Sequence, residues 1–246
     1  MKNKFIVLIV VVLVIVIGFS LASRFQKSRA QGELAKQIFA LGSGVTPVTI
    51  EELKASIAAH EKQMELYVET AARTGIYWKI LAARLSDRGL HGEALEALHR
   101  AIYYIPEDPA LHYSAGISAG ILAKSFHVFP GRENIERDQY FSFAEQAFLR
   151  AIELDNRYLR PRYSLGVLYV FELYMPEEAI PHLERCLEIS RNDVDTMFVL
   201  ARAFYMLQRF QDAIDLYDRI TIISGDEQKR IDAQNNRQLI LEQMNG

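Results

Sequence analysis

The chain of 246 residues has a single cysteine, Cys186. One thiol excludes an internal disulfide and any zinc site built from several cysteines, so cysteine usage does not indicate a redox compartment. Prolines and glycines are also few, seven and 13, which argues against a low-complexity protein. Half of the residues are hydrophobic, and a chain of this length can therefore bury a full core.

Sequence signatures of the common enzyme classes are missing. There is no phosphate-binding loop, no G-x-G-x-x-G after a strand, no nucleophile elbow and no H-E-x-x-H. The six histidines are scattered without pairs four residues apart, which is the spacing that a helical metal site needs. We therefore expect a non-enzymatic protein with no catalytic residues, no cofactor and no metal.

Basic residues are in the minority outside the N-terminal region. Residues 1–29 hold five basic residues and no acidic one, whereas residues 30–246 hold 23 basic and 31 acidic residues. An acidic body lacks the electrostatic footprint of nucleic-acid binding. We expect no nucleic-acid partner.

Charged residues are absent from residues 5–22, a run dominated by Val, Ile and Leu. A helix of this length spans ~27 Å, enough for the core of a bilayer. The run predicts a single-pass transmembrane signal-anchor over residues 1–23. A cleavable signal peptide is the alternative, because Ser20-Leu21-Ala22 offers small residues to a peptidase, but the apolar run exceeds the ~7 to 15 residues of a signal core. Ser23 stands where a lipoprotein would have its lipid-bearing cysteine.

The charges beside this run do not set its orientation. Lys2 and Lys4 with the amino terminus on one side balance Arg24, Lys27 and Arg29 on the other. By analogy with signal-anchored bacterial envelope proteins, we expect the body on the extracytoplasmic, periplasmic side.

We expect residues 24–48 to form a stalk or linker. Within it, residues 26–41 suit a short helix with Leu34, Ile38 and Leu41 on one stripe, and the Gly- and Pro-containing residues 42–47 break it.

A second helix is expected to begin at Thr49-Ile50-Glu51-Glu52, which fits a capping box. We expect it to cover residues 49–73 as an N-terminal capping helix on the open face of the helices after it. The alternative is a coiled-coil dimer, because this helix carries a heptad-like apolar stripe. The stripe consists of Leu53, Ile57, Met64, Val68 and Ala71.

Residues 75–106 predict a helix-turn-helix hairpin in which Gly89 is the turn. The first helical face holds Trp78, Leu81, Ala82 and Leu85, and the second holds Ala94, Leu98 and Ala101 before Pro106. This order resembles the tetratricopeptide repeat (TPR), with its pattern W-x-x-L-G-x-x-Y, then A-x-x-x-F, then Pro, and a period of about 34 residues. Ala82 stands where that pattern has Gly, and Leu85 stands where it has an aromatic residue. Ala is small like Gly, and Leu is large like the aromatic residue, so both keep the size class of the pattern.

The pattern recurs down the chain, most cleanly at Leu165-Gly166-x-x-Tyr169. The resemblance implies an all-α solenoid of about four hairpins, with one extra residue near Met175 and Pro176. The expected repeats are residues 75–108, 109–158 with an insertion at 126–140, 159–193 and 194–225, followed by a C-terminal capping helix at 226–244.

Small residues at one position of every unit predict close helix contacts: Ala82, Gly116, Gly166 and Ala201. Cys186 occupies the position held by Ala101 and Ala151 in other units, so we expect a packed thiol rather than a reactive one.

The resemblance also implies a concave surface, lined by the first helix of each hairpin, that binds peptide or helical segments of other proteins. The implied groove residues are Lys79, Tyr113, Ile117, Arg160, Tyr163, Val167, Phe171, Phe198, Arg202 and Tyr205. The alternative is that the capping helices or the insertion fill this groove. A clamp for the C-terminal carboxylate of chaperones is not expected, because Ala83, Ser114 and Ser164 depart from its pattern.

Five aromatic residues in and directly after the insertion need cover from water: Phe126, Phe129, Tyr140, Phe141 and Phe143. Either they form a local core, or Phe126 and Phe129 lean over the groove as a loop that completes the binding site.

Two functions are consistent with these features. The first is a membrane-anchored scaffold that gathers proteins of an envelope or secretion complex. The second is a structural subunit that assembles through its capping helices and convex face, which makes a homo-oligomer possible but not favoured.

Overall fold

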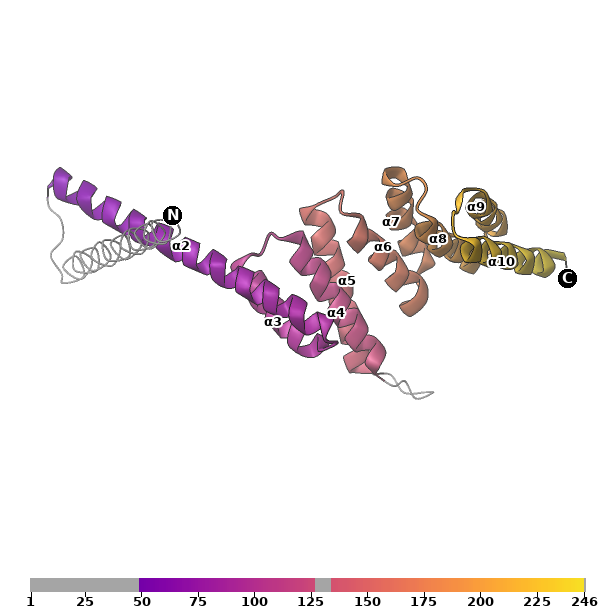
Figure 1. Ribbon diagram of the computed structural model, residues 1–246, viewed down its shortest axis with the longest axis horizontal. Helices are drawn as coiled ribbons and strands as arrows, with labels where there is room; N and C mark the ends of the chain where they lie inside the picture. The colour runs from indigo at the N-terminus through magenta and orange to yellow at the C-terminus, as the bar shows by residue number, and fades with distance from the viewer. Residues whose placement is uncertain (1–48, 127–133, 246) are drawn as a thin grey trace, which may run out of the picture. The chain divides into compact units, whose positions relative to one another are not determined.

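The computed structural model describes residues 49–126 and 134–245, and all regular secondary structure in them is helical (Figure 1). The chain divides into two compact units, residues 1–71 and 72–246. The predicted anchor, the predicted linker and Phe129 lie outside the described residues. Within the described ranges, no helix has both the length and the apolar character needed to cross a membrane.

The first described helix, α2 (Ile50–Asp87), begins with the predicted capping box. The Thr49 backbone N–H donates to Glu52 Oε2 at 3.0 Å, and the Glu52 N–H donates to Thr49 Oγ1 at 3.2 Å. The predicted end of this helix near residue 73 is wrong, because α2 continues without a break to Asp87. A separate capping helix at residues 49–73 therefore does not exist.

Gly75, where we expected the repeat to start, lies inside α2. It is buried, and a Cβ placed on it would come within 2.7 Å of Ile105 Cγ1 and 2.8 Å of Tyr104 Cβ. The glycine serves a close helix contact rather than a break. The break comes at Gly89, as predicted, where φ is +74° and the Leu90 N–H closes the helix end on the Leu85 carbonyl.

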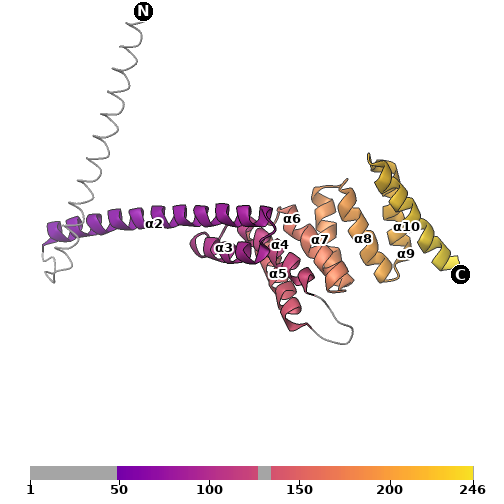
Figure 2. The same cartoon turned by 60° about the horizontal axis from the view of Figure 1, so that its bottom comes forward.

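The second unit is a row of helices in which each packs on its neighbours in the sequence, as Figure 2 shows for α6 to α10. Pairs of helices form the hairpins, so the TPR-like arrangement predicted from the sequence is observed. The helices are α3 (His91–Tyr104), α4 (Pro109–Ser125), α5 (Ile135–Leu154), α6 (Leu159–Val167), the π-helical η1 (Leu168–Glu172), α7 (Pro176–Ile189), α8 (Val194–Met206), α9 (Phe210–Ile223) and α10 (Glu227–Asn245).

Local side chains set where several of these helices begin. The side chains of Asp108, Asn134 and Asp193 accept a hydrogen bond from a backbone N–H in the first turn of α4, α5 and α8. Each satisfies a donor that the helix itself leaves without a partner.

The small residues predicted to permit close contacts are buried. Ala82, Gly116, Gly166 and Ala201 all lie in the interior. A Cβ on Gly166 would lie 2.5 Å from Leu183 Cδ2, so α6 and α7 approach each other where Gly166 leaves room. Cys186 is buried as expected.

The predicted insertion, residues 126–140, is shorter than expected. Its last six residues belong to α5, because Asn134 accepts a hydrogen bond from the Arg137 N–H and starts that helix early. The Phe126 ring stacks on Tyr140 with centroids 5.7 Å apart, and Phe141 is buried in the core. The described aromatic residues of this segment thus pack on the protein.

The extra residue of the third hairpin is taken up inside the helix, earlier than Met175. At η1 the Leu173 N–H donates to the Leu168 carbonyl at 3.0 Å, which closes a turn one residue wider than an α-helical turn. The chain then turns at Tyr174, whose φ is +55°.

Candidate functional site

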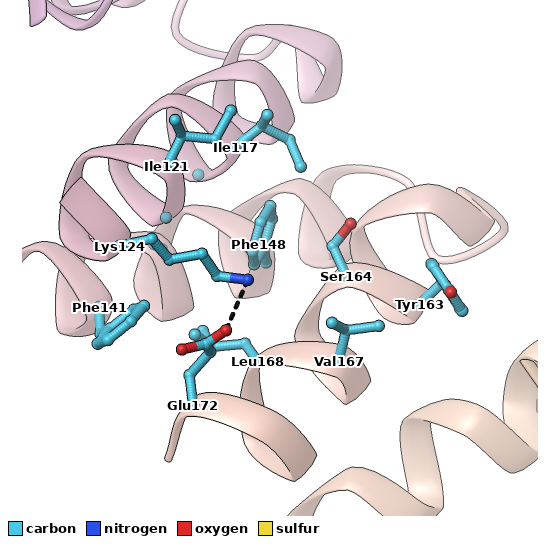
Figure 3. A pocket seen from close by; sticks show the side chains of 13 residues that line it. Ile117, Ile121, Lys124, Phe141, Phe148, Tyr163, Ser164, Val167, Leu168 and Glu172 are labelled. Carbon is cyan, nitrogen blue, oxygen red and sulfur yellow. Dashed lines mark ion pairs between the residues drawn. The ribbon is translucent and has the colours of Figure 1, made fainter. Parts of the chain in front are cut away.

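A pocket of about 330 Å³ lies between α4 and α6, with α5 behind it (Figure 3). All of its lining residues belong to the second unit. They are Gly116, Ile117, Gly120, Ile121, Lys124, Phe141, Ala144, Phe148, Tyr163, Ser164, Val167, Leu168 and Glu172.

Most of the lining is apolar. Phe141 and Phe148 of α5 are buried side chains, and Ile117 and Ile121 of α4 face them from the next helix. Val167 completes the lining on α6. Such a pocket gains free energy by taking an apolar side chain out of water, at roughly 25 cal/mol per Å² of buried surface.

Two glycines on α4 shape the pocket in different ways. A Cβ on Gly116 would lie 2.5 Å from Phe148 Cε1, so Gly116 allows α4 to pack closely on α5. A Cβ on Gly120 would meet no atom within 4 Å. Gly120 therefore leaves open the space that a side chain at that position would fill.

One ion pair marks the polar end of the pocket. Lys124 Nζ at the end of α4 lies 2.6 Å from Glu172 Oε1 in η1 (Figure 3). The Lys124 side chain is 58% exposed and that of Glu172 is 22% exposed. The π turn brings Glu172 to this pocket, whereas the residue before it, Phe171, lines a different one.

A second, more polar pocket of about 620 Å³ lies between α6, α8 and α10. Tyr163 and Val167 line both pockets, and Phe171 and Phe198 line this one. Burial, with the negative charges of Asp195 and Asp193, raises the pKa of Tyr163. Its hydroxyl is therefore a neutral group, able to donate a hydrogen bond, between the two pockets.

Helix α10 supplies the other wall of the second pocket through Lys229, Asp232, Asn235 and Asn236. Lys229 Nζ lies 2.6 Å from Asp195 Oδ1, and this hydrogen bond raises the pKa of Lys229. The wall therefore presents carboxylate, amide and ammonium groups to whatever lies in this pocket.

The structure brings five of the ten predicted groove residues together in the two pockets. These are Ile117, Tyr163, Val167, Phe171 and Phe198.

The other five groove residues lie elsewhere. Lys79 is paired with Asp108 at 2.5 Å, and the Tyr113 ring packs on Phe148 and Tyr158. Arg160 is exposed and lines neither pocket.

Helix α10 occupies the last part of the predicted groove. The Tyr205 hydroxyl donates to Gln243 Oε1 at 2.8 Å, and the Arg202 guanidinium lies over the Tyr205 ring. At this end the chain makes the contacts that we had assigned to a ligand. The position next to α4 and α6 is therefore the better candidate.

Sequence reasoning missed several lining residues. Phe141 and Phe148 lie on the second helix of their hairpin, which the resemblance does not assign to the groove. Gly116 and Lys124 lie four residues before and four residues after Gly120 on one face of α4, and that spacing was a usable signal. Nothing in the sequence located the π turn that positions Glu172.

Comparison with known proteins supports the fold. Residues 170–233 match the family model described as Tetratricopeptide repeat. No curated protein sequence matches the chain.

Several solved structures share the fold at low sequence identity. MamA from Desulfovibrio magneticus RS-1 has a TM-score of 0.59 and 16% identity over 70% of this chain and 86% of its own. YrrB, described as a TPR protein with an unusual peptide-binding site, has a TM-score of 0.57 and 18% identity over 74% of this chain and 83% of its own. TTC0263, a thermophilic TPR protein of Thermus thermophilus, has a TM-score of 0.52 and 18% identity over 85% of this chain and 96% of its own.

These likenesses agree with the hairpins seen in the second unit. Residues 170–233 therefore resemble tetratricopeptide repeats in sequence, and the described helices have the all-α hairpin fold of solved TPR proteins.

Proposed function

We propose that this protein is a non-enzymatic interaction scaffold that binds a peptide or helical segment of another protein through the pocket between α4 and α6. The observation that carries the proposal is the apolar pocket left open at Gly120 and lined by Phe141 and Phe148. A buried aliphatic or aromatic side chain of the partner would be the anchor, because such anchors supply most of the binding energy of small interfaces. A fold likeness to YrrB, a TPR protein with a peptide-binding site, supports the same class of ligand.

The second pocket extends the proposed site. The hydrogen-bonding groups of α10 in this pocket suit polar groups of the ligand that lie next to its apolar anchor side chain. Tyr163 lines both pockets and so lies between them. The ligand would therefore place an apolar side chain beside Gly120 and polar groups toward α10.

We also propose that residues 5–22 hold the scaffold in a membrane, with the repeats on the extracytoplasmic side and a partner in an envelope or secretion complex. Support for this part comes from the apolar run in the sequence.

Gly120→Trp tests the binding site, because a Cβ at this position enters open space and the indole ring would then occupy the pocket. Peptides are selected from a displayed random library on the full chain in detergent micelles, and their affinities are measured by fluorescence anisotropy. Losing an anchor pocket should weaken binding by roughly 30-fold, which corresponds to about 2 kcal/mol.

Gly92→Trp is the matched control. Gly92 is an exposed glycine of α3 where an added Cβ also meets no atom within 4 Å, and it lines neither pocket. Its affinity should equal that of the unmodified chain. Equal binding by both variants, or selected peptides without a large apolar residue, would refute the proposed site.

The alternative function is a structural subunit that assembles with copies of itself. It predicts a stable oligomer over a wide concentration range, whereas the scaffold predicts a monomer with an open site. Sedimentation of the full chain in micelles, with the detergent mass subtracted, separates the two.

A further inference from the structure

The second pocket is lined by aromatic rings from two segments of the chain. Tyr163 of α6 and Phe171 of η1 come from one segment, and Phe198 comes from α8. Phe171 is 45% exposed, so an occupant of the pocket could cover much of its ring. The face of an aromatic ring carries negative electrostatic potential and attracts cations. These rings therefore favour an occupant that joins an apolar stem to a positive charge.

Carboxylates line the same pocket from two helices. Of the described residues in its lining, Asp195 of α8 and Asp232 of α10 are acidic and Lys229 of α10 is basic. Lys229 is already paired with Asp195 at 2.6 Å. Asp232 Oδ1 accepts a hydrogen bond from Gln228 Nε2 at 2.9 Å. A carboxylate can accept several hydrogen bonds, so Asp232 has capacity for a donor from an occupant of the pocket.

Further carboxylates add to the negative charge around the pocket. The hydrogen bond to Asp195 raises the pKa of Lys229 most, and the charges of Asp226 and Asp193 raise it further. Burial raises the pKa of Tyr163 most, and Asp195 and Asp193 raise it further against a smaller opposite effect of Lys229. Carboxylates therefore outnumber the ammonium group here, and this potential favours a cationic occupant.

We propose that the second pocket binds a basic side chain of the peptide ligand, with arginine preferred over lysine. The guanidinium group pairs with Asp232, and its stem and planar face pack on Phe171 and Phe198. Arginine is preferred because its guanidinium bonds a carboxylate through two N–H groups and stacks on aromatic rings, whereas an ammonium is a point charge. Because Tyr163 and Val167 line both pockets, the basic residue lies close in the peptide sequence to the apolar anchor.

This inference rests on the proposed function, which supplies a peptide as the ligand, and it adds which residue type the second pocket selects. Scaffold binding through the first pocket requires an apolar anchor only. The two statements can therefore fail separately, and the residues enriched in selected peptides distinguish them.

Peptide selection is the first test. A displayed random peptide library is selected on the full chain in detergent micelles, and residue frequencies are compared with those of the unselected library. Arginine, and lysine less strongly, should be enriched near an enriched large apolar residue. Apolar enrichment without basic enrichment would overturn this inference and leave the proposed function standing. Basic enrichment without apolar enrichment would do the reverse, and a library without any binder would overturn both.

Asp232→Asn tests the carboxylate itself. The amide oxygen can still accept the hydrogen bond from Gln228, so the substitution removes the charge and keeps this contact. The tightest-binding selected peptide is synthesised with arginine and with citrulline, a neutral counterpart of similar shape. Fluorescence anisotropy should show the arginine peptide binding Asp232→Asn roughly fivefold more weakly than the unmodified chain, as for the loss of a partly exposed charge pair. The citrulline peptide should bind both chains equally.

Glu242→Gln is the matched control. Glu242 is an exposed carboxylate of α10 that lines neither pocket, and it accepts a hydrogen bond from Gln238 Nε2 at 3.0 Å, as Asp232 does from Gln228. Both substitutions change the net charge by the same amount, so a general attraction between an acidic protein and a basic peptide would respond to both. Glu242→Gln should bind the arginine peptide like the unmodified chain.

Two results of these measurements would overturn the basic-residue pocket. One is equal weakening of the arginine peptide by Asp232→Asn and Glu242→Gln, which would assign the effect to net charge. The other is equal weakening of the arginine and citrulline peptides by Asp232→Asn, which would assign it to a change in the fold.

Discussion

Phe148 packs on Gly116 so closely that a Cβ added to Gly116 would lie 2.5 Å from Phe148 Cε1. One helical turn later, a Cβ on Gly120 would meet no atom within 4 Å. Two glycines on the same face of α4 therefore do different things. Gly116 permits helix packing and Gly120 keeps the pocket open.

The two glycines should respond oppositely to alanine. Gly116→Ala should lower the free energy of unfolding by ~1 to 3 kcal/mol, because the methyl group overpacks the contact with Phe148. Gly120→Ala should raise it by ~0.5 to 1 kcal/mol, because alanine restricts the unfolded chain and favours the helix. Urea denaturation of both variants measures this difference, and changes of the same sign and size would contradict it.

The Asp108 side chain links α2 to the start of α4 through hydrogen bonds, and its removal should destabilise the fold. It accepts hydrogen bonds from Lys79 Nζ at 2.5 Å and from the Ala110 N–H at 2.9 Å. Asp108→Ala should lower the free energy of unfolding at pH 7 by ~1 to 2 kcal/mol, since it removes both a helix cap and an ion pair. Lys79→Met, which keeps the cap, should cost less than ~1 kcal/mol.

The effect of Asp108 should depend on pH in a defined direction. Burial raises the pKa of Asp108, but the hydrogen bonds from Lys79 and Ala110 outweigh it and hold the pKa below its usual value of 3.8. A lowered pKa in the folded state stabilises the fold above the unfolded pKa, and that contribution is lost as pH falls through the folded pKa. The difference between the unmodified chain and Asp108→Ala should therefore be constant from pH 7 to about pH 5 and shrink below about pH 4. A constant difference down to pH 2 would contradict it.

Cys186 should be unreactive in the folded protein. Burial, with the negative charge of Asp193, raises the pKa of the Cys186 thiol to about 11, so it is almost entirely protonated at pH 8. Iodoacetamide at pH 8 should label it slowly in buffer and rapidly in 8 M urea, as followed by mass spectrometry of the intact chain (urea at roughly this strength unfolds most domains). Labelling at the same rate in both conditions would show that the thiol is accessible in the folded state.

Tyr174 should be replaceable by glycine with a gain in stability. Its φ of +55° is unfavourable for a residue with a Cβ by ~1 to 2 kcal/mol, and its side chain is 73% exposed. The extra freedom of glycine in the unfolded chain offsets part of that gain, so Tyr174→Gly should raise the free energy of unfolding by up to ~1 kcal/mol. Tyr174→Ala removes the same ring without relieving the backbone and should give no gain. A gain from both variants would assign the effect to the ring.

Local features of the fold were predictable from the sequence because they depend on neighbouring residues. Thr49 and Glu52 lie three residues apart and cap α2 as predicted, and Gly89 ends α2 because it takes a positive φ. Ala82 and Gly166 were predicted to be buried because their small size recurs at one position of each repeat. Side-chain size and helical spacing are properties of the chain itself.

The tertiary structure alone decided how these helices form a site. Glycine often ends a helix, yet Gly75 lies inside α2. Ile105 and Tyr104 pack there in the space that a Cβ would occupy. Lys124 and Glu172 form a pair only because a π turn places Glu172 opposite the end of α4. Gln243 of α10 reaches Tyr205 and closes one end of the predicted groove. The sequence by itself determined the capping box at Thr49, the break at Gly89 and the small interior positions, because those properties follow from local spacing and size. Which side chains face a common pocket depends on packing between helices remote in the chain, and that only the folded arrangement decides.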